Sequence, residues 1–373
     1  MRSLISGAVG LVLGALIGLY GLAPSSRPAP ATGGADSGDS ADSTAGGGRA
    51  APTVHFKMAS AYPGELVQSG TRCRALEREI AAVSDGRVRL QFFEPGALVP
   101  AFEIFDAVSS GAVDAGCSVS GFWAGKIAAL QIFAAIPFGP EHGEFLAWIY
   151  YGGGEEMFRE LYARHNIHGM HCGLVTPEAS GWFRTEITTL EDLKGLKMRF
   201  FGLGAKVMDK LGVSTQLLAA GDIFPALELG TIDATEYSTP AADLKLGLYQ
   251  VAKHYYFPGW HQPATLGELL INMDRWRALT AADKALFEMA CSDNIRRGIA
   301  EGEAIQFQAL ADLEARGVIL HKWPPEILDA FRAAWDQVVA EEVARDADFA
   351  RAWASLSAFR KRYKLWSALA YIP

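Results

Sequence analysis

The chain has 373 residues, of which 50% are hydrophobic and 20% are charged, so it can bury a large core and is too apolar for intrinsic disorder. Its length favours two domains over one. The formal net charge is −8 and no run of Lys or Arg is long enough to follow a phosphate backbone, which argues against a nucleic-acid-binding protein.

The first 52 residues are predicted to lie outside the folded body. Met1 and Arg2 give a positive start, and residues 4–22 form an uncharged apolar stretch, so residues 1–23 are typical of a secretory signal peptide or an uncleaved signal anchor. Residues 24–52 are rich in Pro, Gly, Ser, Ala and Asp and predict a flexible linker. Both alternatives for the apolar stretch export the body of the protein.

The four cysteines lie far apart in the sequence, and no CxxC pair suggests a zinc or redox motif. Their simplest interpretation is as small core residues. Export would also permit a disulfide, but the spacing does not say which residues would pair. The four are Cys73, Cys117, Cys172 and Cys291.

From residue 53 the apolar pattern alternates between strand and helix periods. Strands are predicted over 54–58, 87–92 and 113–119, with helices over 65–84 and 101–109 between them. An apolar run over 130–138 follows. This order is that of a βαβαβ unit, which predicts a parallel sheet with covering helices.

The second half of the chain repeats this rhythm after a long helix. That helix is predicted over 143–164 and should loosen or kink at its glycines, Gly152 to Gly154. A second α/β unit is then predicted, with strands near 168–176, 196–201, 214–218 and 231–237 and helices over 204–212 and 222–229. The last hundred residues are mostly amphipathic helix, whose apolar stripes are typical of core but could also build a dimer interface.

Three charged residues stand where an open α/β sheet binds ligands, at the ends of predicted strands. Arg199 precedes glycines and a helix, and its planar guanidinium can hold a carboxylate with two hydrogen bonds. Glu178 and Glu236 also end predicted strands. The alternatives are an ordinary ion pair for Arg199 and solvated strand ends for the two glutamates. Three histidines in HNIHGMH (residues 165–171) straddle a helix end and a strand start, where their side chains do not converge on a metal.

Several segments together resemble the extracytoplasmic solute-binding proteins of TRAP (tripartite ATP-independent periplasmic) transporters. They are FFEPGALVPAFEIFDAVSSGAVDAG, FWAGKIAALQIFAAIPFG, GWFRTEITTLEDLKGLKMRFFGLGAKVMDKLGV, DIFPALELGTIDATEY and DLKLGLYQVAKHYYFPGW. The resemblance covers most of residues 53–273. It implies an α/β fold of the periplasmic binding protein type, a two-lobed clamshell with a hinge and long connecting helices. Residues 53–175 would form mainly the first lobe, 176–275 mainly the second, and 276–373 a helical region packing across both.

The resemblance also implies a site for an organic acid held by one arginine, which here is Arg199. In members that bind 2-oxo or 2-hydroxy monocarboxylates, a Gln and a Glu-Trp pair supply the shell of a metal cation, and the matching residues here are Glu178, Glu236 and Tyr237. A carboxylate in place of the Gln adds negative charge. Either a more highly charged cation such as calcium replaces sodium, or the ligand differs and the metal is absent.

The same resemblance implies that four more residues line the ligand site. The alternative is that they only pack the two lobes together. These are Phe122, Trp123, Trp260 and His261. Arg184, in GWFR, also resembles a recurrent residue of the family, but its direction is not fixed by the pattern.

The resemblance predicts a periplasmic binding protein, not an enzyme, that delivers its acid to a membrane permease. It would be free or anchored to the inner membrane by residues 4–22, and a homodimer is plausible. The competing interpretations are a tethered sensor and an exported enzyme with Glu178 or Glu236 as base; no nucleophile–base pair or metal triad in the sequence supports the enzyme.

Overall fold

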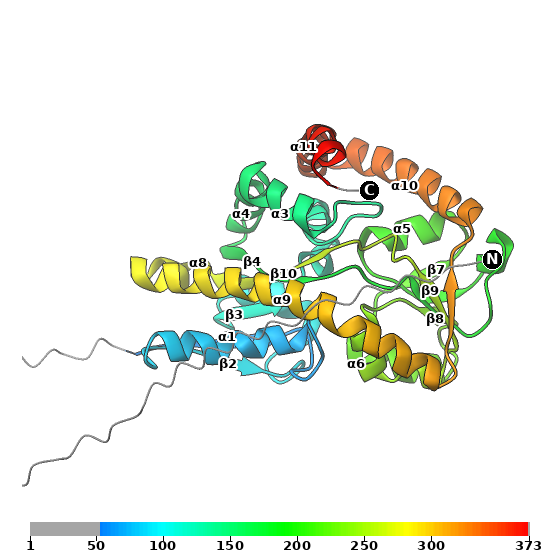
Figure 1. Ribbon diagram of the computed structural model, residues 1–373. Coiled ribbons are helices and arrows are strands. Elements are labelled where there is room, and N and C mark those ends of the chain that lie inside the picture. Colours follow the sequence, from blue (N-terminus) through cyan, green and yellow to red (C-terminus); the bar gives the residue numbers. More distant parts are fainter. Residues whose placement is uncertain (1–52, 372–373) are drawn as a thin grey trace, which may run out of the picture. The chain divides into compact units, whose positions relative to one another are not determined.

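The structure is a computed structural model that describes residues 53–371 (Figure 1). The predicted signal or anchor and the linker lie outside the described residues. Within residues 53–371 none of the helices combines the length and the apolar character needed to cross a membrane. All these residues belong to one compact unit built on two sheets.

The first sheet has five strands in the order β2-β1-β3-β10-β4. β1 pairs in parallel with β2 and β3, as predicted, but β10 runs antiparallel between β3 and β4, so the sheet is mixed. In β2 the residues Val88, Leu90 and Phe92 are buried while Arg89 and Gln91 are exposed, which confirms the predicted alternation. The strands are β1 (Val54–Ser60), β2 (Val88–Phe93), β3 (Ala115–Ser118), β4 (Ile167–Val175) and β10 (Thr265–Asn272).

Three predictions in this first lobe need correction. The predicted helix over 65–84 begins only at Gly70, because the preceding residues form turns that include Gln68 at φ 61°. The apolar run over 130–138 is not a strand, and its first residues belong to a 3-10 helix, Ala128–Phe133. β4, predicted to open the second α/β unit, lies in the first sheet instead. The helices of this lobe are α1 (Gly70–Val83), α2 (Ile104–Ser110), α3 (His142–Tyr151) and α4 (Gly154–Ala163).

The predicted break in the long helix is confirmed. α3 ends at Tyr151 and α4 begins at Gly154, and Gly153 between them has φ 87°, a backbone conformation that favours glycine.

The second sheet has six short strands in the order β11-β9-β5-β8-β6-β7 and forms the second lobe. β5 runs antiparallel to β8 and β9, whereas β6 pairs in parallel with β7 and β8. Its strands are β5 (Gly181–Phe183), β6 (Lys197–Arg199), β7 (Ser214–Gln216), β8 (Ala234–Thr235), β9 (His254–Phe257) and β11 (Ile319–Lys322). Its helices are α5 (Gly202–Lys210), α6 (Ala220–Glu228) and α7 (Pro240–Leu246).

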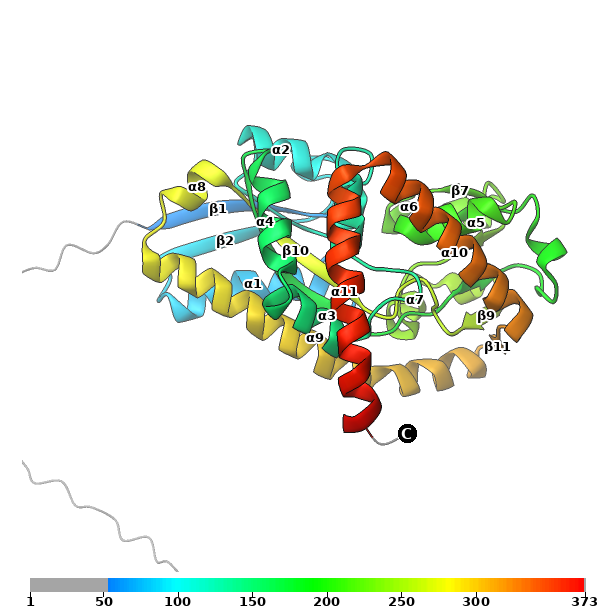
Figure 2. The same ribbon diagram turned by 90° about the horizontal axis from the view of Figure 1, so that it is seen from above.

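Long C-terminal helices connect the two lobes (Figures 1 and 2). The C-terminal helices are α9 (Ala281–Ala315), α10 (Pro325–Arg345) and α11 (Ala347–Ala370), which follow the short α8 (Met273–Arg277) of the first lobe. α9 contacts β4 and α1 of the first lobe and α7 of the second, while α10 packs on α5 and α11 packs on α3 and α4. The predicted stripe on α10 is confirmed as core, with Ile327, Phe331, Trp335 and Val338 buried.

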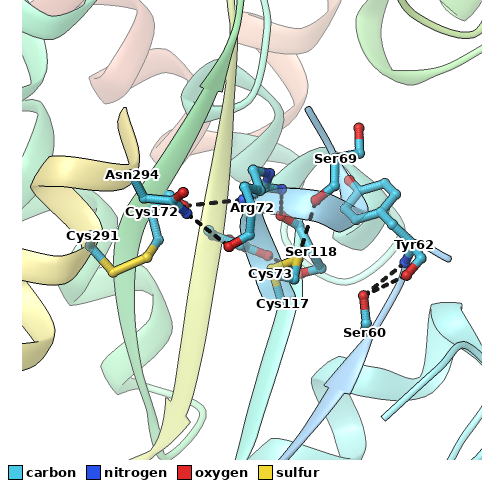
Figure 3. Close-up of a disulfide and its surroundings, with 11 residues drawn as sticks. Ser60, Tyr62, Ser69, Arg72, Cys73, Cys117, Ser118, Cys172, Cys291 and Asn294 are labelled. Carbon is cyan, nitrogen blue, oxygen red and sulfur yellow. Dashed lines mark hydrogen bonds between the residues drawn. A yellow bond between two sulfur atoms is a disulfide. The ribbon is translucent and has the colours of Figure 1, made fainter. Parts of the chain in front are cut away.

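All four cysteines are in disulfides (Figure 3). One disulfide lies within the first lobe, and the other joins the first lobe to α9. Cys73 of α1 is bonded to Cys117 of β3, and Cys172 of β4 is bonded to Cys291 of α9. The interpretation as unbonded core cysteines is therefore wrong. The four cysteines are buried, as expected. The paired residues are 44 and 119 positions apart in the sequence, and the spacing alone does not reveal that the fold brings them together.

Candidate functional site

Arg199 is the last residue of β6, the strand that lies between β7 and β8. Its side chain is 3% exposed and points to the residue that follows β8. Nη1 donates to the Glu236 backbone oxygen at 2.7 Å and to Glu236 Oε1 at 2.6 Å, and Nε donates to the Leu218 carbonyl at 3.3 Å. Arg199 therefore belongs to a buried ion pair that fixes its guanidinium, while Nη2 has no acceptor among these bonds.

Glu236 is fully buried and lies between the arginine and a helix N-terminus. Its Oε1 also accepts a hydrogen bond of 2.6 Å from the backbone N–H of Phe201, the residue before α5. A carboxylate is stabilised there by the free amides and the helix dipole. Its second oxygen, Oε2, has no hydrogen-bond partner within residues 53–371 and lies 3.6 Å from Nε2 of His261.

Glu178 lies in the loop between β4 and β5 and is 4% exposed. Its Oε1 accepts hydrogen bonds from Gln262 Nε2 at 2.9 Å and Thr265 Oγ1 at 2.8 Å, and Oε2 is unpartnered in the described part of the chain. Burial, and then the nearby charge of Glu236, raise the pKa of the Glu178 carboxyl well above its usual value. A bound cation or a proton would relieve this repulsion.

Glu178, Glu236 and His261 together form a buried group of possible metal ligands. Each offers one atom, and these atoms all lie within 4.8 Å of one another. Both ring nitrogens of His261 are unpartnered within residues 53–371, as are the outer oxygens of both glutamates. Buried polar atoms normally have partners, so this cluster has the donor set and the unmet bonding capacity that a cation would use.

A small cavity of about 40 Å³ adjoins these residues and lies between the lobes. Glu178, Arg199 and Tyr237 line it from the second lobe, and Phe122 lines it from the first. Phe122 also packs edge-on against Phe201, with the ring centroids 5.4 Å apart, so an aromatic contact between the lobes closes one side. A space of this size holds only a few water-sized groups in this arrangement of the lobes.

The other predicted wall residues do not line this cavity. Trp123 is turned into the first lobe, where its indole N–H donates to Glu268 at 2.8 Å. Trp260 packs between Phe138 and Phe331 beside a neighbouring groove. Its neighbour His261 joins the candidate metal ligands instead.

The remaining candidates from the sequence lie elsewhere. Arg184 is exposed and donates to the Leu227 carbonyl on the outside of the second lobe. Of the three histidines in HNIHGMH, His168 stacks on Trp276 and His171 packs against Phe158. Their side chains do not converge, as predicted from their positions at a helix end and a strand start.

The polar residues of the cavity that sequence reasoning missed include Arg72, Gln262 and Thr265. One signal was available for Arg72, since it stands four and eight residues before Leu76 and Ile80 on the buried stripe of α1. An arginine in register with a core stripe must find a partner inside the protein. No comparable pattern marks the other two.

A family model described as bacterial extracellular solute-binding protein, family 7, matches residues 61–346. The chain belongs to this family. A monocarboxylate 2-oxoacid-binding periplasmic protein of Nostoc is 35% identical to this solute-binding protein over 318 residues, which cover 85% of this chain and 86% of that one. The predicted family, its role in solute binding and the export of the body are therefore confirmed.

Solved structures of TRAP solute-binding proteins have the same fold. One from Bordetella bronchiseptica, a dimer with copurified calcium and picolinate, is 37% identical with a TM-score of 0.84, covering 86% of this chain and 95% of that one. One from Pseudoalteromonas atlantica, with bound sodium and pyruvate, is 31% identical with a TM-score of 0.81, covering 85% and 97%. The predicted two-lobed α/β fold is confirmed.

Proposed function

We propose that this solute-binding protein captures a small 2-oxo or 2-hydroxy carboxylate between its lobes and delivers it to a TRAP membrane permease. The observation that carries the proposal is the buried group of Glu178, Glu236 and His261 beside Arg199 and the cavity, whose outer carboxylate oxygens and ring nitrogens have no partner within residues 53–371. The relatives support the class of ligand, because one binds 2-oxoacids and two hold pyruvate or picolinate with a cation.

Pyruvate and picolinate share one chemical feature. In each, a carboxylate stands next to a second lone-pair donor, a keto oxygen in pyruvate and a ring nitrogen in picolinate, so the two donors can chelate one cation. In this protein the cation would be held by Glu178, Glu236 and His261, with the unpartnered hydroxyl of Tyr237 close to the same cavity. The free Nη2 of Arg199 would hold the carboxylate.

The charges of this group favour calcium over sodium. Glu178 and Glu236 together carry two negative charges, which a divalent ion balances and a monovalent ion does not. Calcium prefers oxygen ligands, so the two carboxylates and the ligand's own oxygens would hold it. The nitrogen of His261 is a donor that zinc or manganese uses more readily, and these ions belong in the same test.

The proposed function is tested by thermal unfolding of the purified chain after removal of copurified ligand. Pyruvate with calcium is expected to stabilise the protein by about 2.7 kcal/mol at 100 times the dissociation constant, a shift of several degrees. In parallel samples, calcium is replaced by sodium, zinc, manganese or a chelator. In a further sample, pyruvate is replaced by acetate, which lacks the second donor. The absence of a shift with any 2-oxo or 2-hydroxy acid would overturn the assignment.

Glu178→Gln should change which cation supports binding. The amide oxygen can still accept from Gln262 and Thr265, but one negative charge is lost next to Glu236. We expect calcium-dependent affinity for pyruvate to fall by roughly tenfold or more and the sodium-supported affinity to fall less or rise. Calorimetric titration with each cation measures both. An unchanged calcium requirement would remove Glu178 from the cation site.

The proposal includes a homodimer. The Bordetella relative is a dimer, and the end of α11 exposes large apolar side chains at Leu365, Trp366 and Leu369. Such a cluster on one helix is a suitable surface for a second copy.

A further inference from the structure

Arg72 is a second arginine at the cavity, contributed by the first lobe, and it forms no ion pair within residues 53–371. The residue is 6% exposed and lies in α1. Nη1 donates to the Cys172 carbonyl at 3.2 Å and Nη2 to the Ser118 carbonyl at 3.1 Å, while Nε has no acceptor within residues 53–371. Both of these hydrogen bonds go to neutral backbone groups, and the guanidinium carbon lies 5.6 Å from the centroid of the Tyr62 ring.

The strands of the first sheet are shaped to admit this side chain. A Cβ added at Gly267 of β10 would lie 2.2 Å from the Arg72 guanidinium carbon, and one added at Gly173 of β4 would lie 2.5 Å from Arg72 Cδ. The register of the β10–β4 pair also shifts between Gly267 and Glu268. The space that these two glycines leave for the Arg72 side chain is called the slot below. A side chain at either glycine would occupy the slot, so the two strands accommodate a buried arginine there only because both residues are glycine.

Covalent and hydrogen bonds hold the slot in place (Figure 3). The disulfide partners Cys73 and Cys117 are the chain neighbours of Arg72 and of its acceptor Ser118. Cys172, the other acceptor, is bonded to Cys291 and also receives a hydrogen bond of 2.9 Å from Asn294. The guanidinium is thus rigidly aimed, which lowers the entropy lost when it binds a ligand group.

The two arginines of the cavity differ in charge balance. Arg199 is paired with Glu236 at 2.6 Å. Glu268 of the first lobe attracts Arg72, but its carboxylate already accepts hydrogen bonds from Ser118, Trp123 and Tyr162 and forms no ion pair with Arg72. A buried cation without a contacting anion is unfavourable until an anionic group arrives. The wall of the first lobe therefore presents positive charge to the ligand.

Building on the proposed function, we propose that Arg72 binds a second anionic group of the ligand. The acid would chelate the cation beside Arg199 with its 2-oxo or 2-hydroxy carboxylate and reach Arg72 with a carboxylate at its other end. Calcium and the two glutamates are then neutral as a set, and the two arginines are matched by the two carboxylates. The preferred substrate class is a 2-oxo or 2-hydroxy dicarboxylic acid, and its binding joins the lobes.

The test compares two acids of equal chain length, 2-oxopentanoate and 2-oxopentanedioate, by calorimetric titration of the full chain with calcium. The unaltered protein is expected to bind the dianion roughly tenfold or more tightly, because hydrogen bonds to charged groups are the strong ones. Arg72→Gln should abolish this preference and leave the affinity for 2-oxopentanoate nearly unchanged. Arg72→Lys should keep part of the preference, since charge remains and the planar geometry is lost.

Two controls separate ligand contact from structural support. Arg74→Gln removes an exposed arginine two residues away on the same helix, one that pairs with Glu94, and should leave the preference intact. Asn294→Ala removes the other donor to the Cys172 carbonyl without changing charge in the cavity and should do the same. If Arg72→Gln does not fold, Arg72→Lys alone decides the proposal by its partial loss of preference.

Equal affinity of the unaltered protein for the two acids would overturn the role of Arg72, as would an equal loss for both acids in Arg72→Gln. Pyruvate is titrated in the same series. If pyruvate binds with calcium but no dianion preference is found, the proposed function stands and only the role of Arg72 fails. If no 2-oxo acid binds, the proposed function fails with it.

Discussion

Replacing Arg199 with lysine is expected to weaken binding of the carboxylate ligand by roughly 10- to 100-fold while the protein still folds. In the proposed function the arginine would serve two partners at once, because Nη1 already donates to Glu236 and Nη2 would donate to the ligand. A lysine ammonium keeps the charge but is a single point, so it can pair with Glu236 or reach the ligand and cannot do both with good geometry.

Calorimetric titration with pyruvate and calcium measures this loss, and thermal unfolding without ligand shows that the fold is retained. Arg184→Lys is the matched control, because Arg184 belongs to the same lobe and donates to a backbone carbonyl on its exposed side. It should bind like the unaltered protein. An Arg199→Lys protein with unchanged affinity would mean that Arg199 only neutralises Glu236 and that the cation alone holds the carboxylate.

The elements that could be predicted from the sequence are those with one buried face. β2 alternates between buried and exposed residues along its length, and its strand period is plain. β10 is buried at every position and contains a glycine and a glutamate, so it has no period to detect, and it enters the first sheet from far along the chain. β5 and β8 have three and two residues and exist only because neighbouring strands pair with them.

The same distinction applies to the site. Arg199, Glu178 and Glu236 could be found because strand ends and the family resemblance point to them, and the structure does bring them together. His261 was expected to wall the ligand, but its position among the carboxylates depends on how the loop after β9 folds over the second lobe. Arg72 is placed by glycines more than 100 residues away, a relation that no local pattern carries.

Removing the disulfide between Cys172 and Cys291 is expected to have the largest effect on stability. This bond ties β4 to α9 across a separation of 119 residues. A disulfide lowers the entropy of the unfolded chain, and it does so more strongly when it closes a longer loop. The double variant Cys172→Ala/Cys291→Ala should therefore lower the free energy of unfolding by about 5 kcal/mol. The double variant Cys73→Ala/Cys117→Ala, which opens the shorter loop, should lower it by about 4 kcal/mol.

The function should follow the stability, because β4 leads directly into the loop that carries Glu178 and α9 contacts both lobes. Guanidinium unfolding of the two double variants, each compared with the unaltered protein, measures the loss, and titration with pyruvate and calcium shows whether the site survives it. Alanine avoids placing new hydroxyl groups in the core. A loss below about 1 kcal/mol for the longer loop would mean that packing of α9 on β4 already restricts the unfolded chain, so that the disulfide adds little to it.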